Sequence, residues 1–127
     1  MAEDLATDVA LTRLTVGDET LVGGQHSDAE AADGIPEAVT TLKNAIASAD
    51  GLLLSTPEYN NGIPGVFKNA IDWTSRPSAD IAKVFGGRPV ALMGTSPGNF
   101  GTILSQSAWL PVLRTLGTNL WNGGRMM

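Results

Sequence analysis

The sequence lacks cysteine altogether and contains one histidine, His26, among its 127 residues. The absence of cysteine excludes disulfides, iron–sulfur clusters and thiol nucleophiles, and it fits a protein that works in a reducing cytoplasm. His26 lies in a polar stretch at residues 23–33, and one histidine without partners cannot anchor a metal cluster. We therefore predict no metal site and assign no role to His26.

Basic clusters and long apolar runs are lacking as well. The 13 acidic residues outnumber the 8 basic ones, which gives a net charge of −5, and most of the acids precede residue 40. Phosphate backbones bind clustered basic faces, so this distribution argues against nucleic acid as a partner. No apolar run approaches the roughly 18 residues of a membrane span, and the acidic start after Met1 is unlike a signal peptide. We expect a soluble, cytoplasmic protein.

What the sequence does contain is an ordinary globular composition, with 43% hydrophobic and 17% charged residues. A chain of this length and composition builds one hydrophobic core. No internal repeat or low-complexity block divides it. We expect a single domain over residues 1–127.

Several stretches carry strand signals. Alternating residues at 9–14 predict an edge strand, which a polar, glycine-bearing loop follows at residues 17–33. The short apolar runs at residues 51–55 and 89–93 are bounded by turn residues, as in strands that are buried on both faces of a parallel sheet. Residues 119–127 look like the approach to one more strand.

Helix signals alternate with these strands. Pro36 suits a first helical position, and the apolar stripe behind it predicts a helix. Pro64 opens a second helix, in which Lys68 and Asp72 are spaced to form an i,i+4 ion pair. A third helix, towards the C-terminus, contains Pro111, which we expect to kink or split it.

The alternation of strands and helices predicts an α/β fold, in which an open parallel sheet carries helices on both faces. In such sheets, ligands bind outside the carboxyl ends of the strands, at the point where the strand order reverses. Two loops connect a predicted strand to a predicted helix, at residues 56–63 and 94–101. We therefore expect a ligand site built from these two loops.

The first of these loops combines turn residues with polar and aromatic side chains. Pro57 fixes one φ angle, and Gly62 permits either a close backbone approach or a positive φ angle. Between them lie a carboxylate, an aromatic ring and two amides, from Glu58, Tyr59, Asn60 and Asn61. Amides both donate and accept hydrogen bonds, so they match a flat ring with alternating donors and acceptors, on which an aromatic face can stack. Asn-Asn-Gly is also ordinary turn chemistry, so the pattern alone leaves a purely structural turn open.

The second loop is rich in glycine and ends at a helix N-terminus, where free amides and the positive end of the dipole attract negative charge. It lacks the lysine of a nucleoside-triphosphate loop, so its glycines are weak evidence for phosphate binding. A reduced flavin gathers negative charge on the pyrimidine edge of its ring. We hypothesise that this helix N-terminus stabilises a reduced flavin at that edge.

The same loop has a second interpretation. Residues 94–98 match the GxSxG nucleophile elbow of hydrolases, with Ser96 in the position of the nucleophile. The triad of that elbow needs a histidine after the serine, whereas His26 precedes it. We therefore favour a ligand-binding loop over a hydrolase.

A resemblance to the NAD(P)H-dependent FMN reductases, a family of flavodoxin-like proteins, rests on residues 56–60 (Thr-Pro-Glu-Tyr-Asn) and 64–73 (Pro-Gly-Val-Phe-Lys-Asn-Ala-Ile-Asp-Trp). Residues 94–101 are similar to the flavin loop of the same family, and the resemblance covers roughly residues 5–127. It implies a flavodoxin-like open sheet. It also implies an oxidoreductase in which FMN accepts hydride from NADPH or NADH. The electrons would then pass to a small-molecule acceptor, such as a quinone, an azo dye, a metal oxyanion or free flavin.

The resemblance also implies which residues hold the cofactor. One side of the flavin ring would contact the first loop through Pro57, Glu58, Tyr59 and Asn60. The other side and the pyrimidine edge would be approached by Ser96, Pro97, Gly98, Asn99 and Gly101. No catalytic acid or base is implied, because the cofactor carries the chemistry and the protein positions it.

The family assembles through the long helices that flank the flavin. The resemblance therefore implies a homodimer or homotetramer, with Trp73, Arg76 and Trp109 as interface candidates.

The sequence departs from the family at both ends. Members begin with a strand and a Gly-Ser-x-Arg loop that wraps the FMN phosphate, and nothing before Leu5 resembles these elements. Members also complete a fifth strand and a last helix, which would lie beyond Met127. We therefore expect a domain that is partial at both ends. A non-catalytic flavodoxin-like remnant or flavin-binding module is the alternative function.

Overall fold

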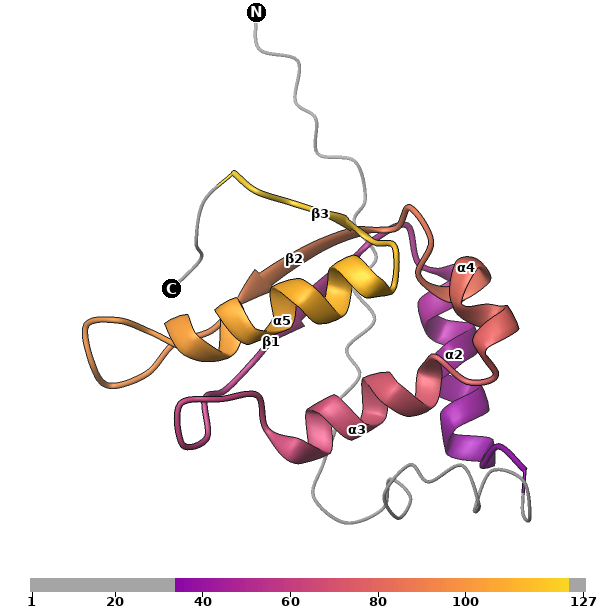
Figure 1. Cartoon of the computed structure of the whole chain (residues 1–127), viewed down its shortest axis with the longest axis horizontal. Helices are drawn as coiled ribbons and strands as arrows, with labels where there is room; N and C mark the ends of the chain where they lie inside the picture. The colour runs from indigo at the N-terminus through magenta and orange to yellow at the C-terminus, as the bar shows by residue number, and fades with distance from the viewer. Residues whose placement is uncertain (1–33, 124–127) are drawn as a thin grey trace, which may run out of the picture.

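Strands and helices alternate in the residues that the computed structural model describes, 34–123 (Figure 1). This alternation confirms the α/β class predicted from the sequence. The predicted strand at residues 9–14, the polar loop at residues 17–33 and His26 lie outside the described residues.

The described sheet has three parallel strands in the order β1-β2-β3. They are β1 (Leu52–Ser55), β2 (Pro89–Met93) and β3 (Asn119–Leu120). Leu52 lies opposite Val90 and Ser55 lies opposite Met93, so β1 and β2 finish side by side at their carboxyl ends. Val90 is also paired with Leu120, so the approach to a strand predicted at residues 119–127 is confirmed at Asn119–Leu120.

Four α-helices in residues 34–123 connect and flank the strands. They are α2 (Glu37–Ser48), α3 (Gly65–Thr74), α4 (Ile81–Val84) and α5 (Ile103–Thr115), with a 3₁₀ turn at Ser78–Asp80 before α4. Pro36 and Pro64 occupy the caps before α2 and α3, where a fixed φ angle and a missing N–H cost no helical hydrogen bond. α5 runs through Pro111 as one helix, so the predicted split does not occur.

Gly117 ends α5 and turns the chain back into the sheet. Its φ angle is +75°, a left-handed conformation that glycine adopts at no steric cost. The Gly117 N–H donates to the Arg114 carbonyl (3.0 Å) and the Thr118 N–H to the Leu113 carbonyl (3.2 Å), which together make a Schellman motif. The chain therefore reverses within two residues and enters β3.

The hydrophobic core lies where the helices meet the sheet. Phe85, Trp109 and Leu113 are fully buried, and the core cluster also contains Ile46, Ile71, Val84, Val90, Leu92 and Leu116. Burying one such side chain contributes about 1.5 to 3 kcal/mol to stability. Residues from α2, α3, α4, α5 and β2 thus share one core.

β1 is buried on only one of its faces within the described residues. Leu52 and Leu54 pack against the core, whereas Leu53, which points to the opposite face, is 52% exposed. The prediction that residues 51–55 are buried on both faces is therefore wrong for residues 34–123. A run of three leucines has the same pattern whether the second face is covered or not.

Two tryptophans lie inside this structure rather than on its surface. Trp73 is 3% exposed and Trp109 is fully buried. The ring of Trp109 meets Phe67 edge-on, with ring centroids 4.9 Å apart and an interplanar angle of 61°. The prediction that Trp73 and Trp109 are interface candidates is therefore wrong, because their rings pack within the fold. Arg76 is half-buried and keeps its candidacy.

A guanidinium holds the end of the sheet that lies away from the two loops. Arg88, just before β2, donates through its Nη atoms to the carbonyls of Ala47 and Ala49, which end α2. Its Nε donates to the Val84 carbonyl of α4 at 2.7 Å. Arg88 thus satisfies carbonyls at the C-termini of two helices, where a positive charge is favoured.

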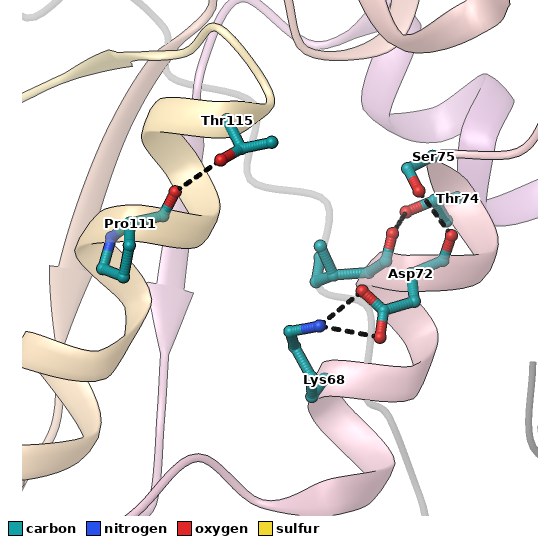
Figure 2. Close-up of polar contacts among 7 residues, drawn as sticks. Lys68, Asp72, Thr74, Ser75, Pro111 and Thr115 are labelled. Carbon is teal, nitrogen blue, oxygen red and sulfur yellow. Dashed lines mark hydrogen bonds and ion pairs between the residues drawn. The ribbon is translucent and has the colours of Figure 1, made fainter. Parts of the chain in front are cut away.

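The surface of α3 carries the ion pair that the sequence predicts (Figure 2). Lys68 Nζ lies 2.7 Å from Asp72 Oδ1 and 2.8 Å from Asp72 Oδ2. At the end of the helix, the hydroxyls of Thr74 and Ser75 donate to the carbonyls of Ile71 and Asp72. The ion pair is partly exposed, so its contribution is small, about 0.3 to 0.5 kcal/mol.

Candidate functional site

The two predicted loops leave the sheet at the same edge. Because Ser55 and Met93 end their strands as neighbours, the residues that follow them start side by side. The Thr56 N–H donates to the Met93 carbonyl at 2.9 Å, which extends the ladder into the first loop. Figure 1 shows both loops beyond the carboxyl ends of β1 and β2, where α3 and α5 begin. The juxtaposition expected from the sequence is therefore present.

The first loop ends in a tight hairpin turn. The backbones of Tyr59 and Gly62 exchange two hydrogen bonds, of 3.1 and 3.0 Å. Asn60 and Asn61, between them, have φ angles of +48° and +63°, the pattern of a type I′ turn. Of the two possibilities that the sequence left open for Gly62, the positive φ angle does not occur there; Asn60 and Asn61 adopt it instead, because asparagine tolerates the left-handed conformation. The turn leaves Tyr59 61% exposed at the tip.

Glu58 links the first loop to the start of α5. Its Oε2 accepts hydrogen bonds from the backbone amides of Leu104 (2.9 Å) and Ser105 (3.1 Å). These are two of the amides at the helix N-terminus that have no partner within the helix. The hypothesis that this N-terminus stabilises a reduced flavin therefore needs revision, because a carboxylate already occupies two of its donors. Sequence reasoning missed this contact.

A buried hydrogen-bond network lies behind Glu58. The Thr56 hydroxyl donates to the Pro57 carbonyl (2.9 Å) and accepts from the indole N–H of Trp109 (3.2 Å), and the Ser105 hydroxyl lies 2.9 Å from it. Thr56 is 1% exposed, and Ser105 and Trp109 are fully buried. Buried hydroxyls need such partners, so the network fixes the first two turns of α5 against the end of β1.

Gly94, the first residue after β2, is packed tightly against Thr102 and Thr56. A Cβ atom at this position would lie 2.0 Å from Thr102 Oγ1 and 2.3 Å from the Thr56 carbonyl oxygen. Only glycine can therefore follow β2 here. The sequence shows a glycine-rich loop, but it does not show which glycine the packing requires.

The second loop closes on itself through Ser96. The Ser96 hydroxyl donates to the Gly101 carbonyl at 2.9 Å, and Gly101 has a φ angle of +58°. Pro97, Gly98 and Asn99 lie exposed between them. A hydroxyl that shapes its own loop is not held by a base, so the hydrolase interpretation gains no support within residues 34–123.

Phe100 and Tyr59 present apolar surface beside these backbone groups. Phe100 is 72% exposed and Tyr59 is 61% exposed, one in each loop. Around them the loops offer the amides of Asn60, Asn61 and Asn99. Aromatic faces, amides and accessible backbone fit a planar heterocycle with alternating donors and acceptors, such as a flavin. The one carboxylate of the two loops is engaged by α5.

Comparison with known proteins shows which family this chain resembles. Residues 1–127 match the family described as NADPH-dependent FMN reductase. A 2-hydroxy-1,4-benzoquinone reductase from Burkholderia sp is 48% identical over 91 residues, which are 72% of this chain and 49% of that protein. An NAD(P)H-dependent FMN reductase from Pseudomonas aeruginosa is 49% identical over 73 residues, 58% of this chain and 38% of that protein.

A solved structure supports the same relationship. FerB, a flavoenzyme NAD(P)H:(acceptor) oxidoreductase from Paracoccus denitrificans, superimposes with a TM-score of 0.74 at 37% identity. The superposition covers 87% of this chain and 57% of FerB. The matched part of this chain spans 49% of the length of the Burkholderia relative and 38% of the length of the Pseudomonas relative. Because the family model matches residues 1–127, this chain belongs to the NADPH-dependent FMN reductase family.

Proposed function

We propose that the protein is an NAD(P)H-dependent FMN oxidoreductase that reduces a small-molecule acceptor. When bound, FMN supplies the chemistry, by taking a hydride from NADPH or NADH and passing two electrons to the acceptor. The quinone reductase and FMN reductase named among the relatives support this reaction class. Quinones are the acceptors to test first, followed by azo dyes and metal oxyanions.

One observation carries the proposal: the two motif loops emerge side by side from the carboxyl ends of β1 and β2. This is the place where open α/β sheets bind their ligands. In our proposal the first loop holds one side of the ring through Pro57, Glu58, Tyr59 and Asn60. The second holds the other side and the pyrimidine edge through Ser96, Pro97, Gly98, Asn99 and Gly101.

Each group has a physical task in this arrangement. Tyr59 would cover the ring with its exposed aromatic face, and Asn60 and Asn99 would donate to or accept from the ring edge. Gly98 leaves its backbone accessible, because the Cβ atom that any other residue would add is missing. Glu58 would act mainly through its backbone at the ring, since its carboxylate holds α5.

The assembly and location of the protein are part of the proposal. We propose a homodimer or homotetramer in the cytoplasm. Exposed apolar side chains on α3 and α5, at Val66, Leu104 and Leu110, are better contact candidates than the buried tryptophans. Within residues 34–123, no helix is both long and apolar enough to cross a membrane.

The proposal is tested by purifying the chain with added FMN and measuring flavin absorbance and NADPH oxidation with a quinone. We expect a bound yellow cofactor and quinone-dependent oxidation. Tyr59→Ala should weaken FMN binding by about tenfold or more, because one aromatic stacking partner is worth roughly 0.5 to 1.5 kcal/mol beyond the area it buries. Trp121→Ala, which removes a half-exposed aromatic that belongs to neither loop, is the matched control.

Two results would contradict the proposal. A chain that binds FMN but never oxidises NADPH or NADH would support the alternative, a flavin-binding module without turnover. A chain that binds no flavin at any concentration tested would support a non-catalytic remnant.

A further inference from the structure

We propose that Glu58 is a positioning residue that holds the two flavin loops in register and offsets the positive end of α5 next to the ring. This inference rests on the proposed function, because the relative position of the two loops matters only if they share one ligand. It concerns a side chain that the motif itself does not explain. The motif places Glu58 beside the ring, whereas its carboxylate points to another element.

The geometry of the contact is that of a helix cap supplied from a distant part of the chain. One carboxylate oxygen accepts from the amides of Leu104 and Ser105, 46 and 47 residues away. Caps normally come from the residue that precedes the helix. Thr102, in that position, makes no side-chain cap hydrogen bond, and its hydroxyl accepts from Gln106 Nε2 at 3.2 Å instead. Glu58 thus takes over the cap of α5.

The second loop lies between these anchors. It leaves β2 at Gly94, whose neighbour is the Thr56 carbonyl, and it enters α5 at residues that Glu58 holds. Thr56 fixes the helix from its buried side through Ser105 and Trp109. Glu58 fixes the exposed end of the same helix. Movement of the start of α5 relative to the first loop therefore has to break the Glu58 hydrogen bonds.

The contact also changes the electrostatics of the site. The N-terminus of a helix carries about half a positive charge, which favours a bound anion. The Glu58 carboxylate brings a full negative charge to the same point, at hydrogen-bond distance. Reduction of the flavin adds negative charge to its ring. With Glu58 at the helix N-terminus, the reduced flavin is therefore less stable than it would be beside an uncapped helix. The reduced cofactor is accordingly a stronger reductant.

Two substitutions separate the roles of Glu58. Glu58→Gln keeps an oxygen that can accept both amides and removes the charge, whereas Glu58→Ala removes both. Glu37→Gln is the matched control, because it removes the same charge from an exposed first-turn position on α2. Amide hydrogen exchange at Leu104 and Ser105 is measured on the whole chain without flavin. FMN dissociation constants and flavin midpoint potentials are then measured on the protein with FMN bound.

For hydrogen exchange we expect Glu58→Ala to speed exchange of the Leu104 and Ser105 amides at least tenfold. Amides in the middle of α5 should keep their wild-type rates. Glu58→Gln should come close to wild type, since its amide oxygen rescues the cap. Wild-type exchange at residues 104 and 105 in Glu58→Ala would overturn the proposal.

For the loaded protein we expect Glu58→Gln to favour reduced over oxidised flavin about tenfold, a rise of about 30 mV for a two-electron couple. Glu37→Gln should leave the potential unchanged. A lower or unaltered potential in Glu58→Gln would overturn the electrostatic role. If the wild-type chain binds no flavin, the proposed function fails, while hydrogen exchange still decides whether Glu58 holds α5.

Discussion

At the scale of single residues, Gly94 gives the sharpest test of how the two loops meet. We expect Gly94→Ala to lower the free energy of unfolding by about 1 to 3 kcal/mol, the usual cost of overpacking a well-packed site. The added methyl group would clash with Thr102 Oγ1 and with the Thr56 carbonyl oxygen, and a backbone carbonyl cannot rotate away. Urea unfolding followed by circular dichroism measures the change.

Gly65→Ala is the control for this substitution. Gly65 begins α3, is exposed, and a Cβ atom there would have no neighbour within 4 Å. Alanine is a better helix former than glycine, so this variant should be neutral or slightly more stable. Equal losses of stability in both variants would show that Gly94 is not a point of close packing.

A second prediction concerns Asn61, which has a positive φ angle although it is not glycine. Asn61→Val should destabilise the hairpin by about 1 to 2 kcal/mol, the cost of a left-handed conformation for an ordinary side chain. Asn61→Gly should retain or raise stability, since glycine adopts this conformation freely. Denaturant unfolding of both variants measures the difference. If valine and glycine gave the same midpoint, the left-handed turn would not exist in solution.

At the scale of elements, an ion pair joins α2 to the turn before α4. Lys43 Nζ lies 2.6 Å from Asp80 Oδ2 and also donates to the Arg76 carbonyl. The lysine is largely buried, with 11% of its side chain exposed, whereas Asp80 is 41% exposed. The hydrogen bond from Lys43 lowers the pKa of the Asp80 carboxyl, and the positive charges of Lys43 and Lys83 add to this effect.

This pKa shift predicts how stability depends on pH. The folded pKa of Asp80 lies below the unfolded value of about 3.9. The pair therefore contributes its stability above about pH 4 and loses it as the pH falls through the lower folded pKa. Asp80→Asn should be less stable than wild type at pH 7, and the gap should close in more acidic solution. A gap that stays constant from pH 7 to pH 2 would exclude this role.

The elements also show how far the sequence could predict the structure. The apolar runs and the prolines predict β1, β2, α2 and α3 well, because these signals are local. The contact between Glu58 and α5 could not be predicted, since its partners are backbone amides 46 and 47 residues away. The burial of Trp73 and Trp109 is likewise a property of packing, because a tryptophan fits both a core and an interface.

At the scale of the whole molecule, the charge distribution suits an anionic ligand better than the net charge suggests. The acids gather before residue 40, whereas residues 34–123 contain five acidic and six basic residues. The part of the chain that carries both loops is thus close to neutral. An anionic cofactor meets no strong repulsion there, although the chain as a whole has a net charge of −5.

The last prediction asks which part of FMN this chain recognises. The residues that resemble the family motif are those expected at the flavin ring, so riboflavin, which lacks only the phosphate, should bind nearly as tightly as FMN. A ligand at 100 times its dissociation constant stabilises the folded state by about 2.7 kcal/mol. Both flavins should therefore raise the thermal midpoint by similar amounts at equal concentration, as measured by differential scanning fluorimetry at a wavelength where flavin does not emit. A shift with FMN and none with riboflavin would contradict recognition through the ring and would require a phosphate site elsewhere in the chain.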